Sequence, residues 1–100
     1  MLISLKDVRE IISDITSKLK GVAEEAYVFG SIVEGGAIIG ESDLDLLIIP
    51  GSREVDYFSL LEGVIEKLLD LGIVLHIHIA DNATYIHLLK SIKNDAIKIV

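Results

Sequence analysis

The sequence predicts one small α/β (α+β) domain in which helices are packed on one face of a small mixed sheet. Its 100 residues are enough for a single hydrophobic core. Segments in which apolar residues recur every three or four positions, as in a helix, are interspersed with short β-prone runs. This order is typical of helices that cover a sheet. No linker or repeat divides the chain, so we expect residues 1–100 to form one domain.

The first half of the chain contains one predicted helix and two predicted strands. From Leu5 to Lys20 apolar residues recur every three or four positions, and Gly21 stands where such a helix would end. Residues 26–29 form a short β-prone run. Residues 44–49 are mostly aliphatic and are followed by Pro50, so we predict a second strand that ends there.

The second half predicts two further helices and two further strands. Residues 56–71 have the apolar spacing of an amphipathic helix. Residues 73–80 are rich in isoleucine, valine and leucine, which predicts a strand. A last helix is expected over residues 81–93, with a capping residue at its start. Residues 97–99 alternate between apolar and polar side chains and are expected to form a short final strand.

Composition excludes several classes of protein. No uncharged apolar run approaches the ~18–20 residues of a membrane-spanning helix, and the first residues lack the order of a signal peptide, so a cytoplasmic protein is expected. The absence of cysteine excludes disulfides, thiolate zinc sites and cysteine nucleophiles. A net charge of −7 is a poor match to a nucleic-acid backbone. The lack of Cys and Gln favours a thermophilic source.

Two carboxylates stand at the start of the second predicted strand. Because side chains alternate along a strand, Asp43 and Asp45 are expected to project from the same face. Two ionised carboxylates held so close repel each other, and a hard divalent cation such as Mg²⁺ between them relieves the repulsion. The same residues also fit a polar loop followed by an exposed strand start, without any metal ion.

A Gly-Ser pair lies between the first predicted strand and a predicted short helix over residues 31–35. Gly30 allows a ligand to approach the backbone closely, and the N–H groups at a helix start bind phosphate oxygens, with the Ser31 hydroxyl as a further donor. Ser31 followed by Glu34 also fits a capping box whose only effect is to begin the helix. The phosphate-binding loop of standard ATPases, G-x-x-x-x-G-K-[ST], is absent.

Taken together, these segments resemble the minimal nucleotidyltransferases of archaea and bacteria, which belong to the superfamily that includes DNA polymerase β. The resemblance is carried by Phe29, Gly30, Ser31, Gly35 and residues 42–48. It implies a polymerase β-like nucleotidyltransferase core.

The resemblance also implies the reaction and its cofactor. A nucleoside monophosphate, AMP from ATP being the expected case, would pass from a nucleoside triphosphate to an acceptor hydroxyl. Asp43 and Asp45 would be catalytic and would hold Mg²⁺, two ions with bound nucleotide, while Gly30, Ser31 and Ser42 would bind the nucleotide.

The pattern is broken where the family has a third carboxylate on a later strand. On the predicted strand over residues 73–79, His76 and His78 share one face, and His76 takes the carboxylate's position. His76 could serve as a base or metal ligand, or its presence could mean a weakened or inactive enzyme. Alternatively both histidines are ordinary surface residues, with Asp81 or a partner supplying the third group. A zinc site formed by the two histidines and Asp45 is a further alternative.

Two features point to a partner. The segment between the Gly-Ser and Asp-x-Asp motifs contains no Lys or Arg, so neutralisation of a triphosphate depends on metal ions, backbone N–H groups or a partner's basic residues. A domain of this length also has difficulty burying 51% hydrophobic residues, which favours oligomerisation or a protein partner. The family resemblance implies a small helical HEPN-type partner and an antitoxin-like role in a two-component module. The alternative is a non-catalytic subunit with this fold that acts by binding such a partner.

Overall fold

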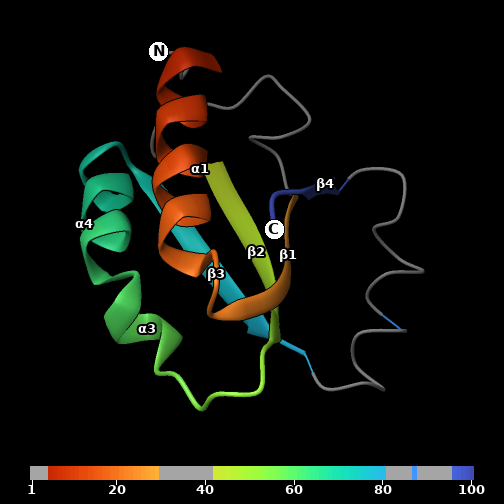
Figure 1. Cartoon of the computed structure of the whole chain (residues 1–100). Coiled ribbons are helices and arrows are strands. Elements are labelled where there is room, and N and C mark those ends of the chain that lie inside the picture. The colour runs from red at the N-terminus through yellow and green to blue at the C-terminus, as the bar shows by residue number, and fades with distance from the viewer. Residues whose placement is uncertain (1–4, 30–41, 81–86, 88–95) are drawn as a thin grey trace.

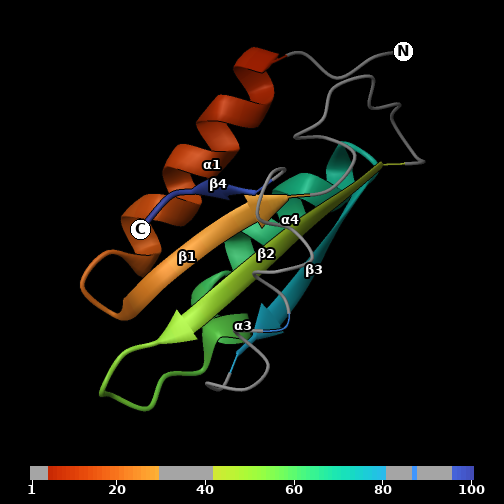
Figure 2. The same cartoon turned by 90° about the vertical axis from the view of Figure 1, so that its right-hand side faces the viewer.

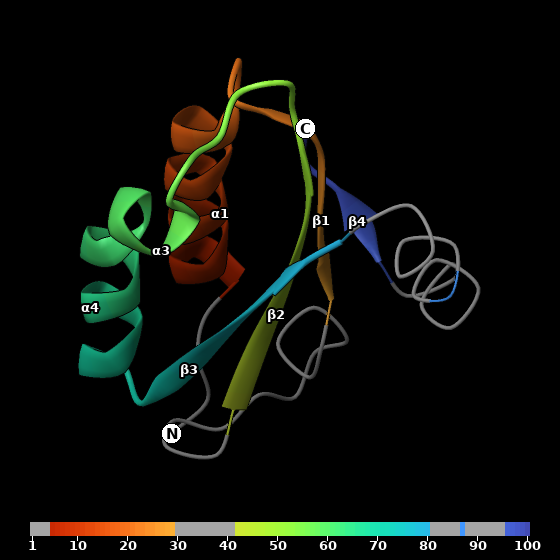
Figure 3. The ribbon, with the colours of Figure 1, turned by 90° about the horizontal axis from the view of Figure 1, so that it is seen from below.

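The computed structural model describes residues 5–29, 42–80, 87 and 96–100, and in this part of the chain three helices lie on one face of a mixed sheet. Figure 3 shows the helices on one side and the strands on the other. The elements, in chain order, are α1 (Leu5–Leu19), β1 (Ala23–Phe29), β2 (Ser42–Pro50), α3 (Tyr57–Leu60), α4 (Glu62–Asp70), β3 (Ile73–Ile79) and β4 (Ile97–Lys98). The predicted fold class is confirmed (Figure 1).

The strand β2 is one of the two inner strands of the sheet. The described strands have the order β3-β2-β1-β4, and β2 pairs antiparallel with β1 and parallel with β3. Figure 2 shows β1, β2 and β3 side by side in front of α3 and α4. The register places Asp45 opposite Phe29 on one side and opposite His76 on the other. One row of the sheet therefore runs through these three residues.

Alternation along β2 decides which way each of its side chains points. Leu44, Leu46 and Ile48 are buried in the core under the helices, with at most 1% of each residue exposed. Since successive side chains of a strand point to opposite faces, Asp43 and Asp45, which flank Leu44, lie on the face away from the helices. A shift of register by one residue would bury both carboxylates in the core, so the hydrophobic pattern fixes their orientation.

The helices bury the faces that their apolar spacing predicts. From α1 the core receives Ile11, Ile15 and Leu19, and from α4 it receives Val64 and Leu68. None of the described helices is long and apolar enough to cross a membrane.

The end of α1 was predicted correctly. The helix stops at Leu19, and Gly21 adopts a φ of 85°. This left-handed backbone conformation is unfavourable for residues with a Cβ atom, and it turns the chain from α1 into β1.

One predicted helix is two helices in the structure. Residues 56–71 were expected to form a single helix, but α3 and α4 are separated at Leu61, where φ is −99° and ψ is 8°. Tyr57, Leu61, Val64 and Leu68 are all buried. The helical spacing of apolar residues therefore continues across the interruption, and spacing alone does not reveal it.

The strand boundaries also differ from the prediction. β1 begins at Ala23 rather than at residue 26. The prediction began too late because the first half of the strand includes two glutamates, a residue type that is uncommon in strands. One of them, Glu25, places its Oε1 3.3 Å from Nζ of Lys98 on β4. β2 spans Ser42–Pro50 and is longer than predicted at both ends. A final strand is present as β4, whereas the short helix over 31–35 and almost all of the last predicted helix lie outside the described residues.

Replacing Gly51 with alanine is expected to destabilise the fold. A Cβ atom there would lie 2.5 Å from the carbonyl oxygen of Val22, which belongs to the backbone and cannot rotate away. We expect a loss of about 1–3 kcal/mol in the free energy of unfolding, measured by urea denaturation.

Gly63→Ala is the matched control. A Cβ atom at Gly63 meets nothing within 4 Å, and the residue lies inside α4, so this variant should gain about 0.5–1 kcal/mol. Equal stability of the two variants would contradict the close approach between residues 22 and 51.

Ser59→Ala is expected to make the protein less stable at neutral pH but not at low pH. The Asp56 carboxylate accepts hydrogen bonds from the Ser59 hydroxyl at 2.9 Å and from the Ser59 backbone N–H at 3.2 Å. These bonds, the side-chain one foremost, hold the pKa of Asp56 below its ordinary value.

A lowered pKa in the folded state gives stability above the unfolded-state pKa, and this stability is lost as the pH falls through the folded-state pKa. The melting temperatures of wild type and Ser59→Ala, measured across a pH series, should therefore converge below about pH 4. A constant difference at all pH values would contradict this account.

Candidate functional site

Two acidic and two histidine side chains meet on the sheet face away from the helices. Asp43 and Asp45 come from β2, and His76 and His78 come from the neighbouring β3. Nε2 of His76 lies 3.5 Å from Oδ1 of Asp43, and Nε2 of His78 lies 3.1 Å from Oδ1 of Asp45. The parallel pairing of the strands therefore forms two adjacent carboxylate–imidazole pairs.

The two carboxylates differ in their exposure to solvent. The side chain of Asp43 is 56% exposed, whereas that of Asp45 is 22% exposed. Asp43 lies near the beginning of β2, and Asp45 lies further along the strand, between β1 and β3. Asp43 is thus the carboxylate more open to an incoming ligand, and Asp45 is the one held more firmly by its surroundings.

An aromatic contact supports the inner pair. The rings of Phe29 and His78 are stacked, with centroids 5.8 Å apart and planes inclined by 29°. Phe29 comes from β1 and His78 from β3, so the contact spans β2, the strand between them. It restricts the orientation of the imidazole whose Nε2 contacts Asp45, and so it restricts Asp45 as well.

The structure brings together part of the predicted site. Asp43 and Asp45 share one face, as predicted, and His76 is directly opposite Asp45 in the register. Ser42 begins β2, but its side chain lies outside the described part, and Gly30, Ser31 and Asp81 lie outside it entirely. Their predicted roles stay predictions.

The sequence analysis did not predict which histidine contacts which carboxylate. His78 makes the shorter contact with Asp45, although only His76 was a candidate for a role in catalysis. The sequence did contain a signal for these contacts. The two aspartates and the two histidines have the same two-residue spacing, so on neighbouring parallel strands each aspartate can face one histidine.

The donor set fits a divalent cation bound together with a substrate. Across residues 5–29, 42–80, 87 and 96–100, no group of three or more His, Asp or Glu side chains is arranged to hold a metal ion. Mg²⁺, however, commonly uses only one or two protein carboxylates and completes its shell with water and substrate phosphates. Asp43 and Asp45 offer two carboxylates on one face, of which one is largely exposed.

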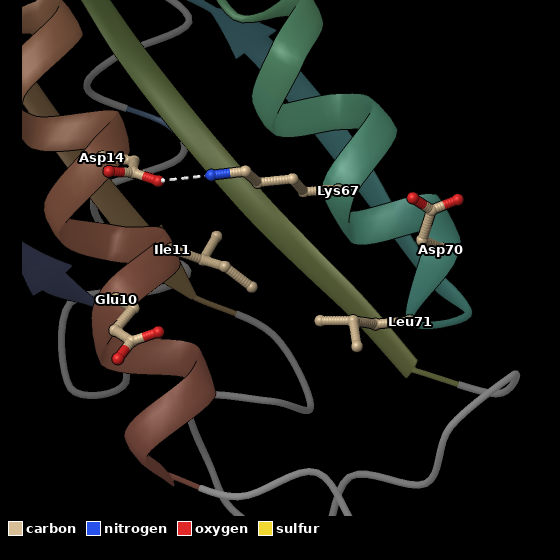
Figure 4. A pocket seen from close by; sticks show the side chains of 6 residues that line it. All are labelled: Glu10, Ile11, Asp14, Lys67, Asp70 and Leu71. Carbon is tan, nitrogen blue, oxygen red and sulfur yellow. Dashed lines mark hydrogen bonds and ion pairs between the residues drawn. The ribbon is translucent and has the colours of Figure 1, made fainter.

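One hollow of the described surface lies between two helices. The helices are α1 and α4, and the hollow, of about 310 Å³, is lined by Glu10, Ile11, Asp14, Lys67, Asp70 and Leu71 (Figure 4). It contains an ion pair of 3.4 Å between Lys67 and Asp14, and both side chains are exposed. This hollow is on the helix layer, across the sheet from the carboxylate–imidazole pairs.

Comparison with known proteins identifies the same family as the sequence motifs. A sequence model of the nucleotidyltransferase domain matches residues 8–99. Four chains of solved structures match, among them one from a crystal structure of the toxin-antitoxin MntA-HpeT in which a tyrosine is mutated to alanine. That chain is 14% identical with a TM-score of 0.52, and the match covers 96% of this chain and 71% of that chain. This similarity is one of fold. No curated protein matches the sequence.

Proposed function

The chain belongs to the nucleotidyltransferase domain family, and we propose that it transfers a nucleoside monophosphate, AMP in the first instance, from a nucleoside triphosphate to a hydroxyl acceptor. The observation that carries the proposal is the placement of Asp43 and Asp45 on one face of β2, away from the helices, beside the two histidines of β3. We further propose that residues 1–100 act as one domain, supported by a family match over residues 8–99.

Asp43 and Asp45 would be the residues that hold the divalent cation. When bound, Mg²⁺ would neutralise the phosphate charge and stabilise the attacking and leaving oxygens. The half-buried Asp45 is oriented by its contact with His78, and the exposed Asp43 is available to the incoming nucleotide. Gly30, Ser31 and Ser42 are proposed to bind the triphosphate through backbone N–H groups and hydroxyls.

His76 is proposed to accept the proton of the attacking hydroxyl. It lies opposite Asp45 in the register, and Nε2 is 3.5 Å from Oδ1 of Asp43, so the imidazole nitrogen faces the carboxylates. A neutral imidazole accepts a proton near neutral pH, which is the role that the family gives to a carboxylate.

A partner protein is the proposed acceptor. The segment from residue 30 to 45 contains no Lys or Arg, which leaves room for basic residues of a partner near the phosphates. One chain of similar fold comes from a crystal structure of a toxin-antitoxin. We therefore propose that this protein is the antitoxin-like half of a two-component module and that a small helical HEPN-type protein receives the AMP.

A second candidate function is binding of such a partner without catalysis. It is favoured by one observation, the imidazole of His76 in the row where the family has a third carboxylate. A catalytically weakened subunit would keep the sheet and the helix layer and would act through its surface.

Transfer of label from ATP separates the two functions. The protein, together with the proteins that co-purify with it, is incubated with Mg²⁺ and ATP labelled in the α-phosphate. The first proposal expects labelled AMP on a protein acceptor with wild type and none with Asp43→Ala or Asp45→Ala. A stable complex that takes no label would favour the second function, and equal labelling with all three proteins would exclude these carboxylates.

A further inference from the structure

The two histidines of the site differ in how closely they approach their carboxylates. Nε2 of His78 lies 3.1 Å from Oδ1 of Asp45, within the usual ~2.7–3.2 Å of an N–H···O hydrogen bond. Nε2 of His76 lies 3.5 Å from Oδ1 of Asp43, which is longer than this range. The contact of His78 is therefore a hydrogen bond, whereas the contact of His76 does not commit its nitrogen in this way.

We propose that His78 and Phe29 are positioning residues, which hold the carboxylate of Asp45 in one orientation for the divalent cation. In this assignment His78 donates a hydrogen bond from Nε2 to Asp45, and Phe29 fixes the plane of the imidazole ring. His76 keeps its separate role as proton acceptor. The inference rests on the proposed function, because Asp45 is a proposed ligand of the cation, and it divides the work between the two histidines.

The chemistry of the carboxylate sets the direction of the hydrogen bond. A carboxylate that binds a cation is ionised, and an ionised carboxylate only accepts hydrogen bonds. Nε2 of His78 must therefore carry the hydrogen, so this nitrogen cannot take a proton from a substrate. The bond uses Oδ1 of Asp45 and leaves Oδ2 for the cation. Outer hydrogen bonds of this kind commonly orient the carboxylates that bind metal ions.

The sheet register shows that the imidazole of His78 leaves its own row to reach Asp45. His78 lies opposite Leu47 in the pairing of β3 with β2, and Asp45 lies two residues earlier on β2. Phe29 lies opposite Asp45 on the other side of β2. Its ring stacks on the imidazole, with centroids 5.8 Å apart and planes inclined by 29°. The hydrogen bond and the stack therefore both hold the imidazole toward the row of Asp45.

Burial explains why Asp45, and not Asp43, needs a positioning partner. The side chain of Asp45 is 22% exposed, so fewer water molecules can bind its oxygens, and a protein donor takes their place. A hydrogen bond in such partly buried surroundings is also stronger than one in water. The side chain of Asp43 is 56% exposed and remains accessible to water.

The position of the imidazole hydrogen in the resting protein tests the inference without metal ion or nucleotide. Long-range proton–nitrogen NMR spectra show which ring nitrogen carries hydrogen. They are recorded at about pH 8, where an imidazole with an ordinary pKa of about 6.5 is neutral. The signals of His78 are those that disappear in His78→Gln. We expect hydrogen on Nε2 of His78, and hydrogen on Nδ1 alone would overturn the inference.

Affinity for Mn²⁺ tests whether these contacts orient Asp45, because Mn²⁺, like Mg²⁺, prefers oxygen ligands. The EPR signal of the free ion is followed as Mn²⁺ is added to wild type and to four variants, which are His78→Leu, His78→Gln, Phe29→Leu and Phe29→Tyr. Glutamine keeps an N–H donor and tyrosine keeps the aromatic ring, so each leucine variant has a conservative counterpart. His87→Leu is the control, because His87 is exposed and comes from neither β2 nor β3.

We expect His78→Leu to bind Mn²⁺ about 10–100-fold more weakly than wild type, and Phe29→Leu to show a smaller loss. His78→Gln, Phe29→Tyr and His87→Leu should stay within a few-fold of wild type. Melting temperatures measured by circular dichroism show that each variant is folded during the titration. Equal Mn²⁺ affinities of folded His78→Leu and His78→Gln would mean a merely structural role and would overturn the inference.

The outcomes also separate this inference from the proposed function. If wild type transfers AMP but His78→Leu keeps the wild-type affinity for Mn²⁺, the inference fails and the function stands. If the NMR and Mn²⁺ results are as expected but wild type transfers no AMP with either Mg²⁺ or Mn²⁺, the function fails and the positioning of Asp45 stands.

Discussion

Replacing Asp45 with asparagine is expected to abolish nucleotidyl transfer while leaving the fold intact. Asparagine has the shape of aspartate and can still contact His78, but it lacks the negative charge that a divalent cation requires. Mutation of residues that merely orient metal ligands costs about 10–100-fold in affinity or activity, so loss of the proposed ligand itself should cost at least about 100-fold.

The measurement is the rate of transfer from α-labelled ATP, together with nucleotide binding in the presence and absence of the metal ion. Asp14→Asn is the matched control, because it makes the same change in charge on α1, across the sheet from the site. It removes only the exposed ion pair with Lys67, and such pairs are worth about 0–1 kcal/mol. If both variants kept the wild-type rate, Asp45 would have no place in the mechanism.

The parts of the fold that the sequence predicts well are those decided by local burial. The helical period of α1 and the opposite faces of β2 follow from where apolar side chains recur, and the end of α1 follows from Gly21. The common face of Asp43 and Asp45 belongs to this group, since the buried leucines of β2 fix it.

The parts that the sequence does not predict depend on contacts between distant segments. The parallel register that sets His76 opposite Asp45 is decided by how β3 packs beside β2 under α4. The family resemblance placed the histidines near the carboxylates, but without that register the sequence does not predict which histidine contacts which carboxylate or that Phe29 stacks on His78. The break at Leu61 was missed for a different reason, because it leaves the apolar spacing unchanged.

Replacing Leu46 with alanine is expected to destabilise the protein by about 2–5 kcal/mol, the usual effect of removing a large side chain from a closed core. Leu46 is fully buried on β2, the strand that pairs with both β1 and β3. Because domains of this size are stable by about 5–15 kcal/mol, the variant should lose a large fraction of its stability.

Urea denaturation measures this loss, with Leu69→Ala as the control. Leu69 lies on α4 and is 56% exposed, so the same substitution there should change stability by no more than about 0.5 kcal/mol. Similar losses in both variants would contradict the assignment of Leu46 to the core.

The Leu46 variant also separates stability from function. Its side chain points away from the carboxylates, so at a temperature where it is folded it should bind metal and nucleotide as wild type does. A bound ion adds stability only to the folded state, and its effect on the urea midpoint should therefore be the same in both proteins at equal affinity. If the Leu46 variant is fully folded yet does not bind the ion, the core side of β2 controls the site more directly than side-chain alternation implies.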